Sequence, residues 1–237
     1  CSNEKWSAEG DCWHFGLNHG HLAIIKTLIS KGANINLRDS DSGNTPLNNL
    51  VGRADCLIDI VKVLLENGAS VNERDDQWNQ TPLHSASTNG NKEVVKLLLE
   101  YNAEVDALRN NLMSPLMCAA YNGHQHIVEL LLVKGANPTF LDVDNSTALH
   151  YAAISDLIQL LISKGADIDT KNAQNQTPLH TACFEGHINV TKCLIKNHAD
   201  INFQTCRGFT PLLAAAESNN LLIAEILGAD INAQGGE

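Results

Sequence analysis

Hydrophobic and polar positions follow one another in blocks along this chain, and a block near its middle shows the full pattern. Thr81 precedes Pro82, which is typical of a helix start because the hydroxyl caps backbone N–H groups and proline needs no donor there. The string Asn89 to Asn91 ends that helix, and the apolar residues between Val94 and Leu99 predict a second one. A polar segment follows. The pattern predicts two short helices and an extended loop.

The same block recurs along the chain with a period close to 33 residues. A Thr-Pro-Leu string or a near variant begins at positions 45, 81, 114, 147, 177 and 210, so successive starts are 36, 33, 33, 30 and 33 residues apart. A Gly-Ala string or a variant begins in phase at positions 32, 68, 102, 135, 165, 198 and 228. Its glycine favours the left-handed end of a helix. Asn102 replaces glycine at modest cost, whereas His198 indicates a strained helix end.

These two strings predict seven units and about fourteen short helices. The approximate units are residues 6–39, 40–75, 76–108, 109–141, 142–171, 172–204 and 205–234, within one array that spans residues 1–237.

The sequence resembles the ankyrin repeat family over essentially residues 6–237. The strings that carry the resemblance are Thr177-Pro178-Leu179-His180 with Gly186-His187, and Ser114-Pro115-Leu116 with Gly123-His124. The resemblance implies an all-α solenoid of helix pairs with hairpin fingers, whose concave face is lined by fingers and first helices. It also implies that His14, His84, His150 and His180, with His21, His124 and His187, are structural and bond to the backbone.

Some units depart from the pattern. The second unit has extra residues around 52–56, and the fifth is about three residues short near 152–157. The last unit is about three residues short in its second helix, and we expect Gly228 to end that helix and lead into a further finger. Because a solenoid normally closes with a polar capping repeat, we expect this chain to be a segment of a longer protein.

Composition excludes several classes of protein. The chain is 43% hydrophobic and 18% charged, which is enough for a folded core, and its apolar runs are too short to insert into a membrane. A formal net charge of −11 disfavours nucleic acid and favours a basic protein partner. Acidic residues expected on or beside the fingers, which should speed the encounter with such a partner, include Asp75, Asp76, Asp142, Asp144 and Glu185. Seven cysteines without a CxxC pair indicate reduced thiols in the cytosol or nucleus. An extracellular location stays open if a leader has been removed.

No pattern points to catalysis, a cofactor or a metal. The close pairs His19/His21 and His124/His126 have no cysteine pair in register, so no zinc site is expected. Cys183 lies near His180 and His187, but nothing supplies an oxyanion hole or an orienting acid. We expect a protein that is not an enzyme, with no catalytic, cofactor-binding or metal-ligating residues.

The remaining candidates are side chains that the repeat itself does not require. Aromatic, Met and Arg side chains are enriched in interface hot spots because they contribute large contact area at low entropy cost. The expected protein-binding residues are Trp78, Gln80, Arg109, Asn111, Met113, Tyr121, Asn122, Phe184, Glu185, Arg207 and Phe209. Tyr121 and Phe184 share one repeat position.

The sequence therefore predicts a non-catalytic module that binds a protein or peptide in a concave groove. Two alternatives remain open. One is a spacer array within a larger channel, toxin or ubiquitin-ligase adaptor. The other is the regulatory part of an enzyme whose catalytic domain lies outside this chain. Many proteins reuse one scaffold, so the fold does not name the partner.

Overall fold

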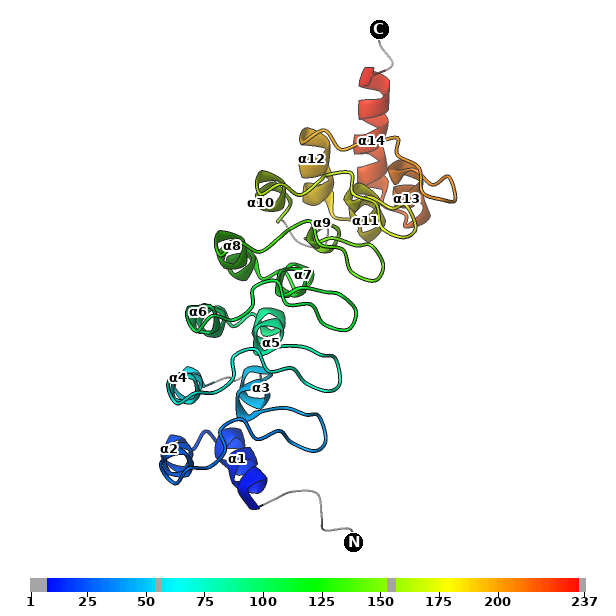
Figure 1. The fold of residues 1–237 in the computed structure, drawn as a ribbon. Coiled ribbons are helices and arrows are strands. Elements are labelled where there is room, and N and C mark those ends of the chain that lie inside the picture. Colours follow the sequence, from blue (N-terminus) through cyan, green and yellow to red (C-terminus); the bar gives the residue numbers. More distant parts are fainter. Residues whose placement is uncertain (1–7, 54–56, 153–156, 235–237) are drawn as a thin grey trace. The chain divides into compact units, whose positions relative to one another are not determined.

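The computed structural model of this chain describes residues 8–53, 57–152 and 157–234. Within these residues it contains fourteen α-helices and no β-strand, in agreement with the sequence prediction (Figure 1). The helices are α1 Ala8–Asn18, α2 Leu22–Ser30, α3 Pro46–Val51, α4 Ile58–Glu66, α5 Pro82–Asn89, α6 Lys92–Glu100, α7 Pro115–Tyr121, α8 Gln125–Val133, α9 Ala148–Ala152, α10 Ile158–Ser163, α11 Pro178–Glu185, α12 Ile188–Lys196, α13 Pro211–Glu217 and α14 Leu221–Gln234.

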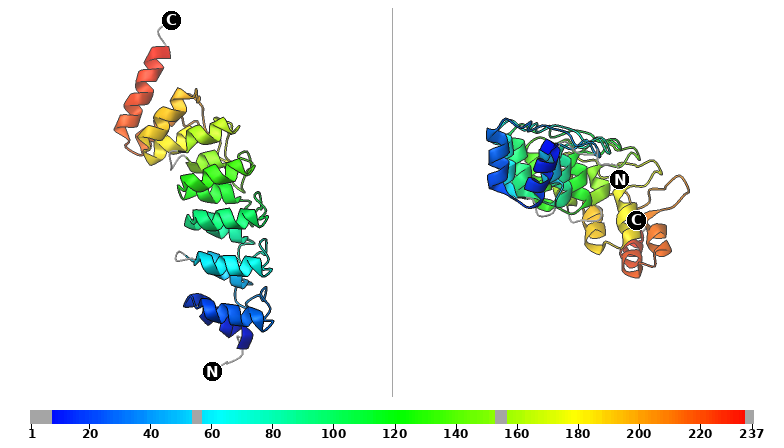
Figure 2. Two further views of the ribbon diagram at one scale, coloured as in Figure 1. Left: turned by 90° about the vertical axis from the view of Figure 1, so that its left-hand side faces the viewer. Right: turned by 90° about the horizontal axis from the view of Figure 1, so that it is seen from below.

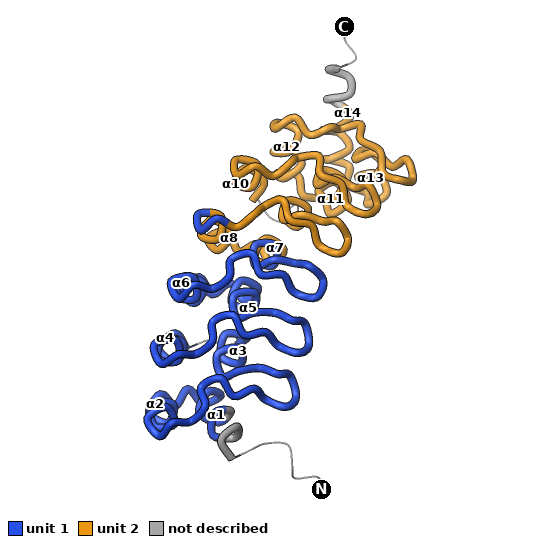
Figure 3. The backbone as a smooth tube through the Cα atoms, viewed as in Figure 1, with its two compact units in different colours: residues 1–118, 133–135 blue, residues 119–132, 136–237 orange. Residues whose placement is uncertain are grey.

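The chain divides into two compact units (Figure 3). Unit 1 comprises residues 1–118 and 133–135, and unit 2 comprises residues 119–132 and 136–237. In unit 1, α1, α3 and α5 pack in one row and α2, α4 and α6 in a second row (Figures 1 and 2). In unit 2, α9, α11 and α13 form one row and α10, α12 and α14 another. A single array over residues 1–237 stays a prediction.

The first helix of a pair begins where the sequence predicts. Thr45, Thr81, Thr177 and Thr210 have extended backbone at the N-cap, and a proline follows each of them in the first turn. All but Thr210 are fully or almost fully buried, so the cap hydroxyls satisfy N–H groups that water cannot reach.

The second helices end in a left-handed residue, also as predicted. At the end of α6, Asn102 has a φ of 63°, and the amide of Ala103 donates to the carbonyl of Leu98 at 2.9 Å. His198 has a φ of 67° at the end of α12, and the amide of Ala199 donates to Leu194 in the same way. These bonds satisfy carbonyls that the helix leaves unpaired. The alanine is then buried, which turns the chain into the next finger.

The core of each unit lies between its two rows of helices. In unit 1, Leu47, Leu64, Leu83 and Leu98 are fully buried, and they come from α3, α4, α5 and α6 in turn. In unit 2, Leu149, Leu161, Leu179 and Leu194 occupy the equivalent positions and are fully buried as well. Each helix pair therefore shares its apolar surface with its neighbours, as in other repeat proteins.

One prediction about the last repeat, residues 205–234, is wrong. Gly228 does not end a helix, because α14 runs from Leu221 to Gln234 through the whole Gly-Ala-Asp string. At two other Gly-Ala strings the alanine is buried, as for Ala136 and Ala166, whereas Ala33 and Ala69 are half-buried. In α14 the local sequence is rich in Leu and Ala, whose helix propensity favours continuation of the helix.

The irregular connections at 52–56 and 152–157 lie largely outside the described residues, which exclude 54–56 and 153–156. The helices beside the second of them are short, with 5 residues in α9 and 6 in α10. No helix in the described ranges is both long enough and apolar enough to cross a membrane.

The short helices α9 and α10 should open before α5 and α6. The pair α5 and α6 has 8 and 9 residues and buries Val94, Val95 and Leu98 from its second helix, whereas α10 buries only Ile158 and Leu161. Fewer helical bonds and fewer buried side chains lower the free energy of local opening. Hydrogen exchange measured by NMR should show faster exchange in α9 and α10. Equal protection of the two pairs would contradict this prediction.

Candidate protein interface

In the part of the chain that the structure describes, six hairpin fingers connect the helix pairs: residues 39–44, 75–80, 109–113, 142–146, 172–176 and 205–209. In most fingers the side chain of the first residue accepts hydrogen bonds from backbone N–H groups of the tip. The Asp75 carboxylate accepts from the Trp78 amide at 2.7 Å, and the Asp142 carboxylate accepts from Asp144 and Ser146, both at 2.9 Å. The finger shape is therefore fixed from inside by one acceptor.

Because of this role, some acidic residues stabilise the fingers and are not surface charges. The sequence predicted Asp75 and Asp142 as charges on or beside the fingers that speed encounter with a partner, but both are buried and hold their own fingers. Asp76 forms an ion pair with Arg38 at 2.7 Å, so its charge is also partly compensated. Of the acidic residues expected beside the fingers, Asp76, Asp144 and Glu185 are exposed.

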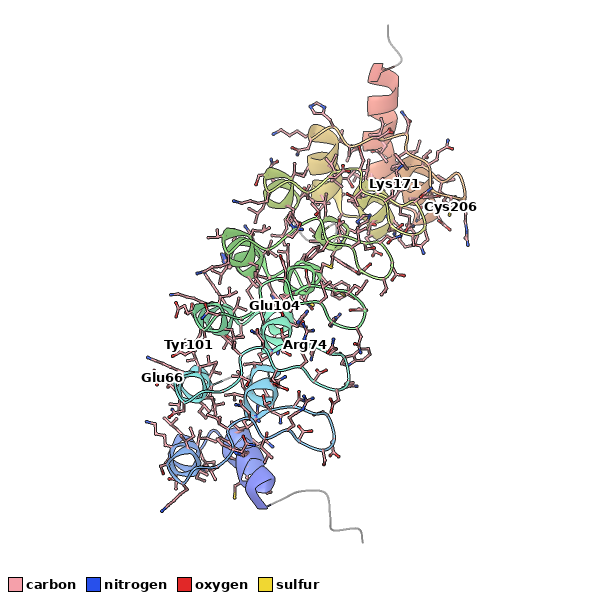
Figure 4. All side chains as sticks on the ribbon, in the orientation of Figure 1. Glu66, Arg74, Tyr101, Glu104, Lys171 and Cys206 are labelled. Atoms are coloured by element: carbon pink, nitrogen blue, oxygen red, sulfur yellow. The ribbon has the colours of Figure 1, made fainter. Side chains whose placement is uncertain are left out.

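Neighbouring fingers are linked by backbone bonds between their tips. The amide of Asn110 donates to the carbonyl of Trp78 at 2.9 Å in unit 1, and the amide of Cys206 donates to the carbonyl of Gln174 at 3.2 Å in unit 2. Figure 4 labels Cys206 and the ion-paired residues Arg74 and Glu104 among the side chains. The tips within a unit thus form a ladder that presents successive side chains.

Three buried histidines attach the fingers 109–113, 172–176 and 205–209 to the first helix of the preceding helix pair. Nδ1 of His84 accepts from the Thr81 amide at 3.2 Å, so Nε2 carries the proton and donates to the Met113 carbonyl at 3.1 Å. His150 and His180 repeat the arrangement toward the carbonyls of Gln176 and Phe209. The structural role predicted for these three histidines is confirmed; the side chain of His14 lies outside the described residues.

Burial lowers the pKa of His84 to about 4, and the nearby Arg109 and Arg74 act in the same direction. Burial also lowers the pKa values of His150 and His180. The neutral ring is the form that fits, because a proton on Nδ1 would face the N–H of the N-cap residue.

The finger 109–113 departs from the rule that the others follow. Its first residue is Arg109, which cannot accept a hydrogen bond, and the acceptor role moves to the Asn111 side chain, which receives the Met113 amide at 3.3 Å. The tip residue is Leu112, with a φ of 60°. The other tips carry Gly43, Asn79, Asn145, Asn175 and Gly208 in this left-handed conformation. For a residue with a side chain such as leucine, the left-handed conformation costs about 1–2 kcal/mol.

Unit 2 contains a hollow of about 350 Å³ between two fingers and two helices. Its walls bring together residues from finger 172–176, α11, finger 205–209 and α13. The lining residues are Gln174, Gln176, His180, Phe184, Thr205, Cys206, Arg207, Phe209, Ala214 and Glu217. The hollow therefore combines apolar walls with two amides, a cation and an anion, a mixture typical of sites for a peptide or small molecule.

Three of the predicted binding residues meet in this hollow, namely Phe184, Arg207 and Phe209. Phe184 is 49% exposed, Arg207 is exposed, and Phe209 is half-buried. Glu185 follows Phe184 in α11 and is exposed, but it does not line the hollow.

The other predicted residues of unit 2 lie near α7. Tyr121 is 54% exposed and contacts Tyr151 edge to face, with ring centroids 5.6 Å apart, and the Tyr151 hydroxyl donates to Asp142. Asn122 is exposed. Neither Tyr121 nor Asn122 lines the hollow.

In unit 1 the predicted residues differ in exposure. Trp78 is 53% exposed, whereas Gln80, Arg109 and Asn111 are half-buried. Met113 is 6% exposed, and its carbonyl and sulfur are used within the protein, so its side chain contributes packing beneath the finger.

The sequence reading missed Leu112, Cys206 and Tyr151. Leu112 could have been found by aligning the fingers, since a branched apolar residue stands where the other fingers have Gly or Asn. Cys206 and Tyr151 carry no such signal, because their roles depend on contacts between segments distant in sequence: Cys206 lines the hollow, and Tyr151 contacts Tyr121.

The described residues contain no group of three or more His, Cys, Asp and Glu side chains that could hold a metal ion. Burial raises the pKa of Cys183 to about 12, so this thiol stays protonated at neutral pH. A thiolate is the nucleophilic form of cysteine, so this environment opposes the Cys-His chemistry considered above.

The sequence model of a family described as ankyrin repeats, in three copies, matches residues 13–109, 103–172 and 149–235. No curated protein shows a significant match to the chain.

Replacing His84 with Asn should make stability less dependent on pH. The neutral His84 contributes its full stability above the unfolded pKa near 6.5, and this contribution falls by up to about 3 kcal/mol as the pH drops to 4. Asn48 shows that asparagine can fill this role, because its amide donates to the Glu73 carbonyl at 3.0 Å and its oxygen accepts from Thr45. Urea unfolding should show that the free energy of unfolding falls less between pH 7 and pH 4 for His84→Asn than for wild type.

His150 and His180 remain in the His84→Asn variant. The slope of the unfolding free energy against pH should therefore decrease without disappearing. The free energy of unfolding at pH 7 measures separately the cost of the shorter side chain. An unchanged slope would show that His84 does not titrate as its burial implies.

Proposed function

Since the chain belongs to the ankyrin repeat family, whose members generally mediate protein–protein interaction, we propose that it binds an extended segment of a protein partner in the hollow of unit 2. The observation that carries this proposal is the meeting of Phe184, Phe209 and Arg207 around one hollow. Their exposure leaves aromatic and guanidinium surface that a partner can cover. Ankyrin repeat domains are typically non-catalytic, which agrees with this role.

The apolar walls would supply most of the affinity. Phe184 projects from the last turn of α11 with about half of its surface exposed, and Ala214 of α13 leaves room beside it. An aromatic ring loses little conformational entropy when it is covered, so a large apolar side chain of the partner gains contact area at low cost.

The polar rim would fix the direction of the bound segment. Gln174 and Gln176 come from one finger, and Arg207 comes from the next, so amide and guanidinium groups lie on the finger side. Glu217 lies on α13 at the helix side. An extended peptide has backbone donors and acceptors along both edges, which suits a site with polar groups on two sides.

The basic partner predicted from composition remains part of the proposal, but its support is the net charge of −11 alone. A negative field speeds the encounter with a positively charged partner without contributing much to short-range contacts. Raising the salt concentration should then slow association more than it speeds dissociation. Stopped-flow measurements with the captured partner would test this expectation.

Replacing Phe184 with Ala should weaken partner binding by about 1–3 kcal/mol, because a hot-spot aromatic residue would lose its contact area. Affinity capture with residues 1–237 as bait, followed by mass spectrometry, would identify the partner. Titration calorimetry would compare the affinities of wild type and Phe184→Ala. Circular dichroism would verify that the variant is folded.

Val133→Ala is a suitable control for this experiment. Val133 is an exposed apolar residue at the end of α8 and does not line the hollow, so its truncation should leave the affinity unchanged. The proposal would be wrong if the folded double variant Phe184→Ala, Arg207→Ala bound the partner as tightly as wild type.

A further inference from the structure

The finger 109–113 of unit 1 combines features that no other described finger has. Leu112 is 43% exposed at the tip in a left-handed conformation that asparagine or glycine occupies in the other five fingers. Strain of this kind persists where the surrounding structure enforces it, and it is concentrated at functional sites. The conformation presents an apolar side chain at a point where the fold alone would favour a small or polar residue.

Arg109 carries an uncompensated positive charge at the base of this finger. Its Nε donates to the Asn111 side-chain oxygen at 2.9 Å, and one terminal nitrogen lies 2.9 Å from the Met113 sulfur. Among the described residues no carboxylate pairs with it, whereas Arg38 pairs with Glu73 and Arg74 with Glu104. Both contacts of Arg109 are neutral, and they leave other N–H donors of the guanidinium unused.

The neighbouring finger adds a second exposed apolar group. Trp78 is 53% exposed, and its carbonyl receives the Asn110 amide at 2.9 Å, so the tips of fingers 75–80 and 109–113 lie next to each other in unit 1. A half-buried cation therefore lies below two adjacent tips that carry Trp78 and Leu112.

We propose that fingers 75–80 and 109–113 bind a protein segment that carries an Asp or Glu residue close to a large apolar residue. The carboxylate would form a charge-assisted pair with Arg109, and the apolar side chain would cover Leu112 and Trp78. Charge complementarity selects this occupant, because a guanidinium in a protein of net charge −11 has no carboxylate of its own. One cation suits a carboxylate, whereas phosphate groups are bound by clustered Arg and Lys residues.

This inference rests on the proposed function, because it assumes that the chain binds proteins, but it concerns another site. A partner with a net positive charge can still carry one carboxylate beside an apolar residue, so the two proposals are compatible. The second site also gives unit 1 a specificity of its own.

A random linear peptide library, displayed with its C-terminus joined to the carrier, would test the inference with the full chain as the target. This arrangement offers side-chain carboxylates and no free C-terminal carboxylate. The peptides that bind at this site should contain Asp or Glu within a few positions of Trp, Phe, Leu or Ile. Their affinities would then be measured with synthetic peptides in solution.

Two variants separate binding from structure. Arg109→Gln should weaken the acidic peptides at least about tenfold, because it removes the charge and keeps a polar side chain. The matched control is Lys96→Gln, which removes an exposed charge on α6 and should change nothing. Leu112→Asn should weaken the same peptides while raising the Tm by about 2–4 °C, since asparagine relieves the left-handed strain.

The opposite signs of the two effects of Leu112→Asn exclude unfolding as the reason for lost binding. A higher Tm with unchanged peptide affinity would overturn the inference, and so would selected peptides that lack acidic residues or do not respond to Arg109→Gln. Peptides that respond only to Phe184→Ala would support the hollow of unit 2 and overturn this second site. A library that gives no binding peptide would contradict both proposals.

Discussion

The hydrogen bond between a buried side chain of a first helix and a carbonyl of the following finger is the interaction on which this structure depends. The fold has no sheet in its described part, so each finger must be attached by other means. His84, His150 and His180 provide the attachment with one ring, since one nitrogen caps the helix start and the other reaches the next finger. Asn48 makes a similar link with its amide: its oxygen accepts from the Thr45 hydroxyl, and its nitrogen donates to the carbonyl of Glu73, just before finger 75–80. In these four helix pairs one residue thereby links the helix start to the following connection and to the neighbouring pair.

Much of this fold could be predicted from local sequence because its signals are local. A Thr-Pro pair begins a helix through its own hydroxyl and its own missing N–H, and a glycine or Asn102 ends one through its own backbone freedom. The prediction was wrong at Gly228, where the same string lies inside α14. The string alone therefore does not determine a helix end, because the helix propensity of the surrounding Leu and Ala residues favours continuation of the helix there.

The candidate sites were harder to predict, because each is made from two fingers or from a finger and two helices. Phe184, Arg207 and Phe209 were identified as single exposed candidates, but only the fold shows that they share a hollow with Gln174 and Glu217. Met113 has the residue type of an interface anchor, and its burial beneath the finger could not be read from its type. Asp75 and Asp142 looked like surface charges because their partners are backbone amides, which leave no trace in a sequence.

Most fingers are held from inside by their first residue, and Arg109 is the exception. The position just before the left-handed tip carries a different side chain in each finger. That position is occupied by Ser42, Trp78, Asn111, Asp144, Gln174 and Arg207. The finger backbone at this position thus tolerates hydroxyl, indole, amide, carboxylate and guanidinium groups. Single substitutions at this position can therefore change what such a protein recognises without compensating changes in the core. Binding specificity can then diverge in evolution faster than the fold.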